Sequence, residues 1–144
     1  MKPEDLRIGN LVRQKGIEGD LGIIEVESIH DDGINVRAET YYHGYDEYRG
    51  LEADYAWKEI EGIPLTEEWL ERFGLEKVGC ISTIYEIEVN LEHIKYFNVH
   101  IEEGVLSISV DCYGKEQQLI EIEYVHQLQN FYHSLKGEDL PTKG

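Results

Sequence analysis

The stretch IPLTEEWLERFG at residues 63–74 constrains the fold of this chain more than any other stretch. Pro64 ends the extended segment before it, because proline has no N–H to give to a neighbouring strand. Thr66 suits the N-cap of a helix, since its hydroxyl can accept a hydrogen bond from a first-turn N–H. Gly74 suits the left-handed position that follows a last helical turn. The apolar side chains at helical spacing between them are Trp69, Leu70 and Phe73. The stretch therefore predicts a short helix that links two β-rich halves.

The half before this helix reads as short strands separated by glycine turns. Residues 22–30 and 34–39 are rich in β-branched side chains and flank Asp32-Gly33, a pair that favours a hairpin turn with positive φ at the glycine. A strand is also expected at residues 6–13, with core candidates Leu6, Ile8, Leu11 and Val12. Residues 57–60 are expected to run as a strand into the helix. This pattern predicts an SH3-like small β-barrel or a bent sheet in residues 1–62.

The half after the helix alternates apolar and polar residues in four runs between residues 81 and 124, with glycine turns at Glu103-Gly104 and Tyr113-Gly114. Such a period of two predicts a four-stranded antiparallel meander with one apolar face. The other face is expected to be exposed, polar and acidic, and it collects Glu86, Glu88, His100, Ser107, Ser109, Asp111, Glu121 and Glu123.

The last element is expected at residues 124–137, YVHQLQNFYHSLKG, where apolar residues recur at helical spacing and Gly137 ends the run. This helix is expected to pack on the apolar face of the meander. The whole chain is therefore predicted to be α+β. It divides into residues 1–62, the linking helix at 63–74, and the sheet with its helix at 75–144.

The charge of the chain excludes some partners and favours others. The formal net charge is −17, and it is spread evenly: residues 1–74 hold 18 Asp and Glu against 8 Lys and Arg, and residues 75–144 hold 12 against 5. A chain without a basic stretch is not expected to bind nucleic acid or an anionic membrane directly. Its charge favours solubility, or a partner with a basic surface. The charged N-terminus lacks the apolar core of a signal peptide, so a cytoplasmic protein is expected.

A tyrosine-rich loop at residues 40–57 is the best candidate for a binding surface. Tyrosine and tryptophan offer large, rigid contact areas with a polar end. The candidate residues for binding a ligand or a partner are Tyr41, Tyr42, His43, Tyr45, Tyr48, Arg49 and Trp57, together with Arg37. Alternatively, these rings fold back over a small barrel as a lid.

The sequence shows almost no motif for catalysis, metal binding or a cofactor. Cys80 and Cys112 lie far apart and suit neither a CxxC site nor a disulfide framework, so reduced thiols are expected. The six histidines show no H-x-H or HExxH spacing, and no serine has the context of a nucleophile elbow. We therefore expect no catalytic residues, no metal site and no cofactor.

Two blocks of the sequence resemble a family of small uncharacterised proteins encoded by bacterial phages and prophages. That family carries a PLTEEWL–FGF block in the middle and a YVHQLQNLY–LTGEEL block near the end. The matching positions here are residues 64–70 with Phe73 and Gly74, residues 124–130 with Tyr132, Leu135, Gly137 and Leu140, and the start LRIGN. The chain departs from the family at Leu75, where phenylalanine is frequent, and in its long tyrosine-rich loop. The resemblance implies an accessory phage product acting in the host cytoplasm, and it implies no activity.

Three functions follow from these features. The first is a non-enzymatic acidic binding protein that inhibits or sequesters a host factor, such as a defence or regulatory protein with a basic surface. The second is a binder of a small nucleotide signal, in which tyrosines of the loop stack on the base while Arg37, Arg49 and His43 meet the phosphate. The third is a small hydrolase, which a buried cluster of histidine, carboxylate and nucleophile would favour. Homo-oligomerisation through a sheet edge or the loop stays open.

Overall fold

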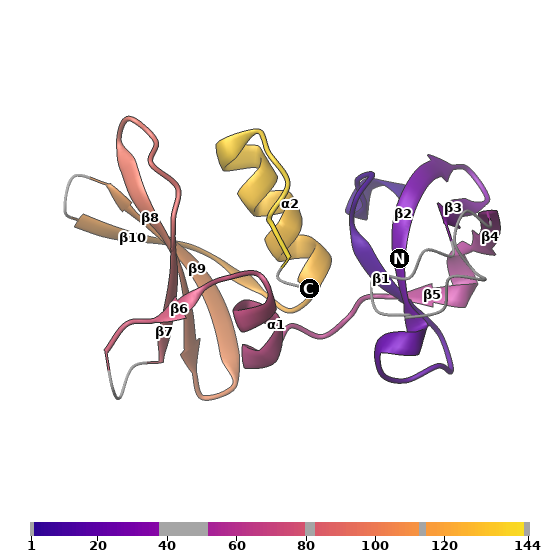
Figure 1. Cartoon of the computed structure of the whole chain (residues 1–144), viewed down its shortest axis with the longest axis horizontal. Coiled ribbons are helices and arrows are strands. Elements are labelled where there is room, and N and C mark those ends of the chain that lie inside the picture. The colour runs from indigo at the N-terminus through magenta and orange to yellow at the C-terminus, as the bar shows by residue number, and fades with distance from the viewer. Residues whose placement is uncertain (1, 38–51, 80–82, 113–114, 143–144) are drawn as a thin grey trace. The chain divides into compact units, whose positions relative to one another are not determined.

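The computed structural model describes residues 2–37, 52–79, 83–112 and 115–142. It is a mixed α/β fold whose strands lie in two antiparallel sheets (Figure 1). The chain forms two compact units. The first combines the residues up to Pro64 with Tyr124–Phe131, and the second combines Leu65–Glu123 with Tyr132–Lys143. The chain therefore leaves the first unit after Pro64 and returns to it at Tyr124.

The first unit is built on a five-stranded sheet with the strand order β4-β3-β2-β1-β5. Every pairing in it is antiparallel. Its strands are β1 (Leu11–Gln14), β2 (Ile23–His30), β3 (Gly33–Arg37), β4 (Glu52–Ala56) and β5 (Ile60–Glu61). Short 3-10 turns lie at Pro3–Asp5, Asp20–Gly22 and Trp57–Glu59. Its apolar core consists of Leu6, Val12, Ile24, Val26, Ile34 and Ile60.

Several expectations for this unit are wrong. A strand was expected at residues 6–13, but β1 begins only at Leu11, because the chain turns at residues 8–9. Ile8 was a core candidate, but it is 58% exposed, because the chain turns at Gly9, which has a φ of +92°, before β1 begins. Residues 57–60 were expected to form a strand, but Trp57–Glu59 forms a 3-10 turn and only Ile60 enters a strand. Glu59 stabilises that turn by accepting a hydrogen bond from the backbone N–H of Ala56 at 2.8 Å.

The β2–β3 hairpin is confirmed, but its glycine acts differently from the expectation. Gly33 does not have a positive φ, and it pairs with His30 as the first residue of β3. A Cβ atom on Gly33 would lie 1.9 Å from the carbonyl oxygen of Tyr55 in β4. Glycine is therefore required because β4 approaches β3 closely at this point. The conformation of the turn itself does not require it.

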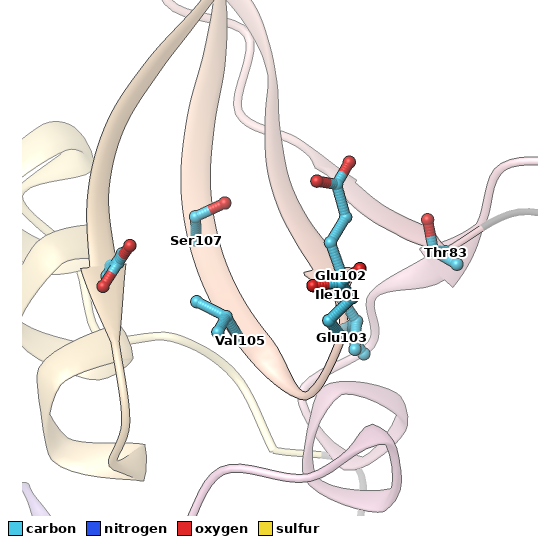
Figure 2. A pocket seen from close by; sticks show the side chains of 7 residues that line it. Thr83, Ile101, Glu102, Glu103, Val105 and Ser107 are labelled. Carbon is cyan, nitrogen blue, oxygen red and sulfur yellow. The ribbon is translucent and has the colours of Figure 1, made fainter.

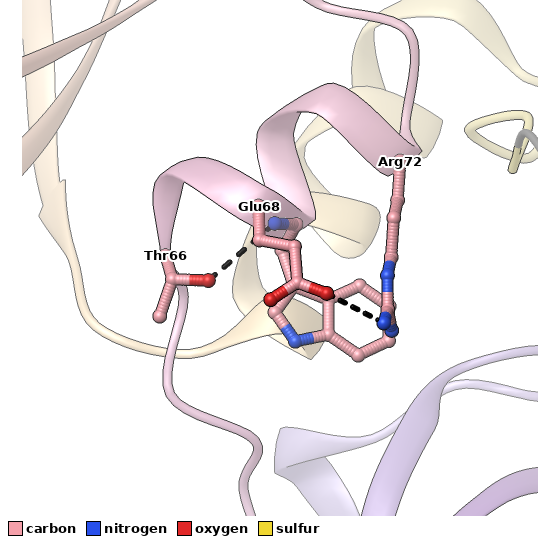
Figure 3. A network of polar contacts seen from close by, with 4 residues as sticks. Thr66, Glu68 and Arg72 are labelled. Carbon is pink, nitrogen blue, oxygen red and sulfur yellow. Dashed lines mark hydrogen bonds and ion pairs between the residues drawn. The ribbon is translucent and has the colours of Figure 1, made fainter. Parts of the chain in front are cut away.

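Helix α1 (Glu67–Arg72) confirms the prediction for the central block (Figure 3). The Thr66 hydroxyl accepts a hydrogen bond from the N–H of Trp69 at 3.4 Å, and Gly74 has a φ of +85°. Arg72 Nη2 lies 2.7 Å from Glu68 Oε1, and its guanidinium carbon lies 4.8 Å from the centre of the Trp69 ring. The caps and the ion pair thus hold a helix that is too short to be stable alone.

The second unit is built on a five-stranded sheet, in which each strand pairs with the next along the chain. Its strands are β6 (Glu76–Lys77), β7 (Ile84–Glu88), β8 (Ile94–Glu102), β9 (Val105–Cys112) and β10 (Lys115–Ile122). The four runs of period two correspond to β7–β10, and the short β6, which periodicity did not indicate, adds a fifth strand. Glu103 and Gly104 both have positive φ, so the predicted turn between β8 and β9 is confirmed.

Helix α2 (Val125–Lys136) ends at Gly137, which has a φ of +74°, as predicted. Its later residues belong to the second unit, where the Tyr132 ring meets the Phe97 ring of β8 edge-on, with centres 6.1 Å apart. Its earlier residues belong to the first unit. Neither helix among the described residues is long and apolar enough to cross a membrane.

Two side-chain amides of α2 bind the first residue of β1 and residues shortly before it, and form what we call the amide latch. Gln129 Oε1 accepts a hydrogen bond from the N–H of Leu11 at 2.9 Å. Asn130 Oδ1 accepts one from Asn10 Nδ2 at 2.8 Å, and Asn130 Nδ2 donates to the carbonyl of Asp5 at 3.1 Å. Asn10 and Gln129 are buried, so these bonds satisfy polar groups that water does not reach. The latch joins the LRIGN start to the YVHQLQN block.

Replacement of Gln129 by alanine is expected to lower the free energy of unfolding by about 2–3 kcal/mol, because the N–H of Leu11 would stay buried without an acceptor. Urea unfolding at neutral pH measures the change. The matched control is Gln117→Ala, an exposed residue of the edge strand β10, with an expected change within about 0.5 kcal/mol. Equal losses in both variants would contradict a specific role for the latch.

His126 gives the first unit a dependence on pH. Its ring is buried and stacks on Tyr124 with centres 5.6 Å apart, and its Nδ1 has no hydrogen-bond partner among the described residues. Burial lowers the pKa of His126, against the opposing effect of nearby Asp5. As the pH falls below the ordinary pKa of histidine, His126 becomes protonated in the unfolded chain but stays neutral in the folded chain. The contribution of the neutral ring to the free energy of unfolding is therefore complete above about pH 6.5. It is lost as the pH falls toward and through the lowered pKa of the folded chain.

His126→Phe keeps a planar ring without a titratable group. We expect its stability to fall less steeply than that of the natural chain as the pH drops from about 7 to about 5. Urea midpoints across this range measure both slopes, and the carboxylates contribute equally to both proteins. Parallel curves for the two proteins would contradict the assignment.

Candidate functional site

The candidate site is the face of the second sheet that points away from Phe97 and Tyr132, which we call the polar face. Its cross-strand rows follow from the register: Ile84, His100, Ser107 and Glu121 form one row, and Glu86, Asn98 and Ser109 form the next. Further positions are Glu76, Glu88, Tyr96, Glu102, Val105, Asp111 and Glu116. None of these positions carries Lys or Arg. The prediction that one face of this sheet gathers the acidic residues is confirmed for the described strands.

Glu116 organises the centre of the polar face from the edge strand β10. Its Oε1 lies 2.9 Å from His100 Nε2 in β8, and its Oε2 accepts a hydrogen bond from Asn98 Nδ2 at 3.4 Å. The same His100 Nε2 lies 2.8 Å from Ser109 Oγ in β9. The carboxylate thus reaches across β9 and ties three strands together.

The expectation that this face is simply exposed is wrong at its centre. Asn98 and Ser107 are each 6% exposed, and Ser109 is fully buried. His100 and Glu116 lie over Ser109, and their side chains are 15% and 45% exposed. The centre of the polar face is therefore a hydrogen-bonded polar layer, and its solvent-exposed charges lie around that layer.

An open hollow of about 710 Å³ lies at the β8–β9 turn. Figure 2 shows Val105 and Ser107 on one side of it and Glu102 and Thr83 on the other. Its lining is completed by Ile101, Glu103 and Glu121. Three carboxylates around apolar atoms of Val105 and Ile101 favour a cationic group with an apolar stem, such as a lysine or arginine side chain.

The cluster of Ser109, His100 and Glu116 contains the residue types of a hydrolytic triad, but its geometry does not form a proton relay. In a relay, one ring nitrogen accepts the proton of serine while the other donates to the carboxylate. Here a single atom, His100 Nε2, faces both Ser109 Oγ and Glu116 Oε1. A nitrogen that donates to the carboxylate has no lone pair for the hydroxyl proton. Ser109 is also inaccessible to a substrate.

Metal ligation finds no support on the described strands and helices. Among the residues that the structure describes, no group of three or more His, Cys, Asp or Glu side chains could hold a metal ion. Cys80 lies outside the described residues, and Cys112 ends β9. The expectation of two reduced thiols therefore stays a prediction.

The tyrosine-rich loop lies mostly outside the described residues. This applies to Tyr41, Tyr42, His43, Tyr45, Tyr48 and Arg49. Arg37 ends β3, where it pairs with Glu52. Trp57 packs against the core of the first unit, and its indole N–H donates to the carbonyl of Asp31 at 2.8 Å. Trp57 therefore supports the β2–β3 turn.

The sequence did not single out Asn98 or Glu116 for this site. Asn98 follows Phe97 within a strand, and Glu116 was one of many acids near a turn. The available signal was the period of two, which places Asn98 and His100 on one face of β8. The contact between His100 and Glu116 depends on the strand order, which periodicity does not report.

Comparison with protein-family models, with curated proteins and with solved structures finds no match to this chain. No relative therefore supplies a role for any residue of the polar face. The resemblance to phage-encoded proteins stays a prediction from the sequence blocks.

A fluorophosphonate probe is expected to leave Ser109 unlabelled, because its hydroxyl is buried and no base accepts its proton. Intact-mass spectrometry measures the label, and a serine hydrolase in the same reaction serves as the positive control. Labelling that disappears in Ser109→Ala would instead establish a reactive serine.

Proposed function

We propose that this chain is a non-enzymatic binding protein whose second unit engages a partner with a basic surface through the polar face. The supporting observation is the composition of that face, where seven positions are acidic and none is Lys or Arg. Carboxylates gathered on one face of a sheet steer and orient a basic partner. The hollow beside Glu102 and Glu121 offers room for one projecting basic side chain.

We further propose that the first unit is an SH3-like small barrel. The strand order β4-β3-β2-β1-β5 supports this, since the last strand closes beside the first. A 3-10 turn at Trp57–Glu59 between β4 and β5 gives further support. The fold carries no function by itself.

The resemblance to phage and prophage proteins suggests the setting. In this proposal the chain acts in the cytoplasm of a bacterial host, where it inhibits or sequesters a host factor such as a defence or regulatory protein. An acidic face can occupy a groove on that factor which otherwise holds an anionic ligand.

The other two functions receive less support. The nucleotide-signal binder needs free stacking rings, and Trp57 packs against the core of the first unit. The hydrolase needs a base for Ser109, and His100 Nε2 faces Glu116. Neither is proposed.

A set of charge variants tests the proposal. The polar-face variant changes Glu86, Glu88, Glu102 and Glu121 to glutamine. It is expected to slow association with a partner captured from host lysate by about tenfold or more at low salt, because steering depends on local charge. Stopped-flow or surface-plasmon kinetics at two salt concentrations measure the rate.

The matched control changes four exposed acids of the first unit, Glu4, Glu18, Asp32 and Asp54, to their amides. It alters the net charge by the same amount. If this control slows association as much as the polar-face variant, or if salt leaves the rate unchanged, the polar face is not the binding surface.

A further inference from the structure

Strand β10 leaves one of its sides open. It is the terminal strand of its sheet, so β9 pairs with one side only. Among the described residues, no backbone hydrogen bond outside the sheet ends on β10. Lys115, Glu116, Gln117, Ile120 and Glu121 are all exposed. An exposed edge of this length is a template for one more strand.

The register identifies which backbone groups face the open side. The two-residue turn between β8 and β9 makes Glu102 and Val105 a hydrogen-bonded pair, so Val105 and every second residue after it bond to β8. The alternate residues of β9 bond to β10, where their partners include Gln117 and Ile120. The N–H and C=O groups of Glu116 and Glu121 therefore point away from β9.

We propose that β10 accepts an extended segment of a partner as an antiparallel added strand, one that alternates lysine or arginine with apolar residues. This inference rests on the proposed function and specifies the chemistry of the partner. Strand addition supplies affinity through backbone hydrogen bonds and specificity through alternate side chains.

Charge explains the basic half of this pattern. Glu116 and Glu121 both lie on the polar face, because the register shift between Gln118 and Ile120 restores their alignment. A residue of an added strand opposite Glu121 would lie within reach of its carboxylate, whereas the Glu116 carboxylate is turned inward to His100 and Asn98 of β8. Asp111 pairs with Glu116 in register, and its Oδ1 is buried without a partner among the described residues. The carboxylates of Asp111, Glu116 and Glu121 together make this end of the sheet negative, which favours a basic strand over an acidic one.

Exposed apolar surface on β10 explains the apolar residues of the proposed added strand. Ile120 pairs with Ile108 on the apolar face, yet Ile108 is fully buried and Ile120 is 46% exposed. The difference arises because Ile120 lies on the edge strand. An apolar side chain on the added strand would cover Ile120.

A second copy of the chain fits this edge poorly. Hydrogen-bonded pairs across an antiparallel edge join residues whose backbone groups face outward on both strands. For two copies of β10, these residues include Glu116, Gln118 and Glu121 on each side. Self-pairing would therefore bring the acidic edges of two copies together, in a chain whose net charge is already −17.

Three peptides of alternating lysine and valine test the inference on the full chain. One is unmodified, one carries backbone N-methyl groups on its lysines, and one carries them on its valines. All three have the same charge, but only lysine methylation removes the N–H groups that would bond to β10. Fluorescence polarisation is expected to show similar affinities for the first and third peptides and a loss of about tenfold or more for the second.

Amide hydrogen exchange on the complex gives an independent readout. The N–H groups of Glu116 and Glu121 are expected to gain protection, whereas those of Gln117 and Ile120, which already bond to β9, are expected to change little. Equal affinity of the three peptides, with strong salt dependence, would overturn strand addition and leave the proposed function standing. Failure of all three peptides to bind would also overturn strand addition. The proposed function is tested separately, by the association kinetics of the polar-face variant and its control.

Discussion

The first unit depends on the amide latch between α2 and the start of β1. The N–H of Leu11 and the side chain of Asn10 are buried, and a buried polar group without a partner costs about as much as a large core defect. Gln129 and Asn130 meet these groups from a helix more than a hundred residues away in sequence. The sheet of residues 11–61 is therefore stabilised by a helix that follows the second sheet in the sequence. These hydrogen bonds join LRIGN and YVHQLQN in one structural feature.

In the second unit, one sheet separates an apolar side from a polar, acidic side. Its apolar face meets Tyr132, and its polar face carries acids around a layer formed by the buried Asn98 and Ser109, which His100 covers. Glu116 holds that layer from the edge strand, at 2.9 Å from His100. The buried layer keeps the polar face in one arrangement, and the surrounding carboxylates stay available to a partner. Rigidity and acidity together make this face a better candidate for recognition than for chemistry.

Some features were predictable because their causes are local. Thr66 caps α1 and Gly137 ends α2, since each depends on a few neighbouring residues. The acidic face of β7–β10 was predictable because strand side chains alternate. Other expectations failed where distant residues decide. Ile8 is exposed because Gly9 turns the chain, and Gly33 is required by the approach of Tyr55 rather than by its own turn.

The sequence by itself determined the two β-rich halves, the capped helices and the acidic character, because periodicity, capping and net charge are properties of neighbouring residues. Only the tertiary structure decided that Asn10 bonds to Asn130, that Glu116 reaches His100, and that β10 ends its sheet with an open side. These are contacts between segments far apart in the chain, or the consequence of strand order. A one-dimensional pattern carries no record of which segments meet, since many pairings satisfy the same alternation of apolar and polar residues.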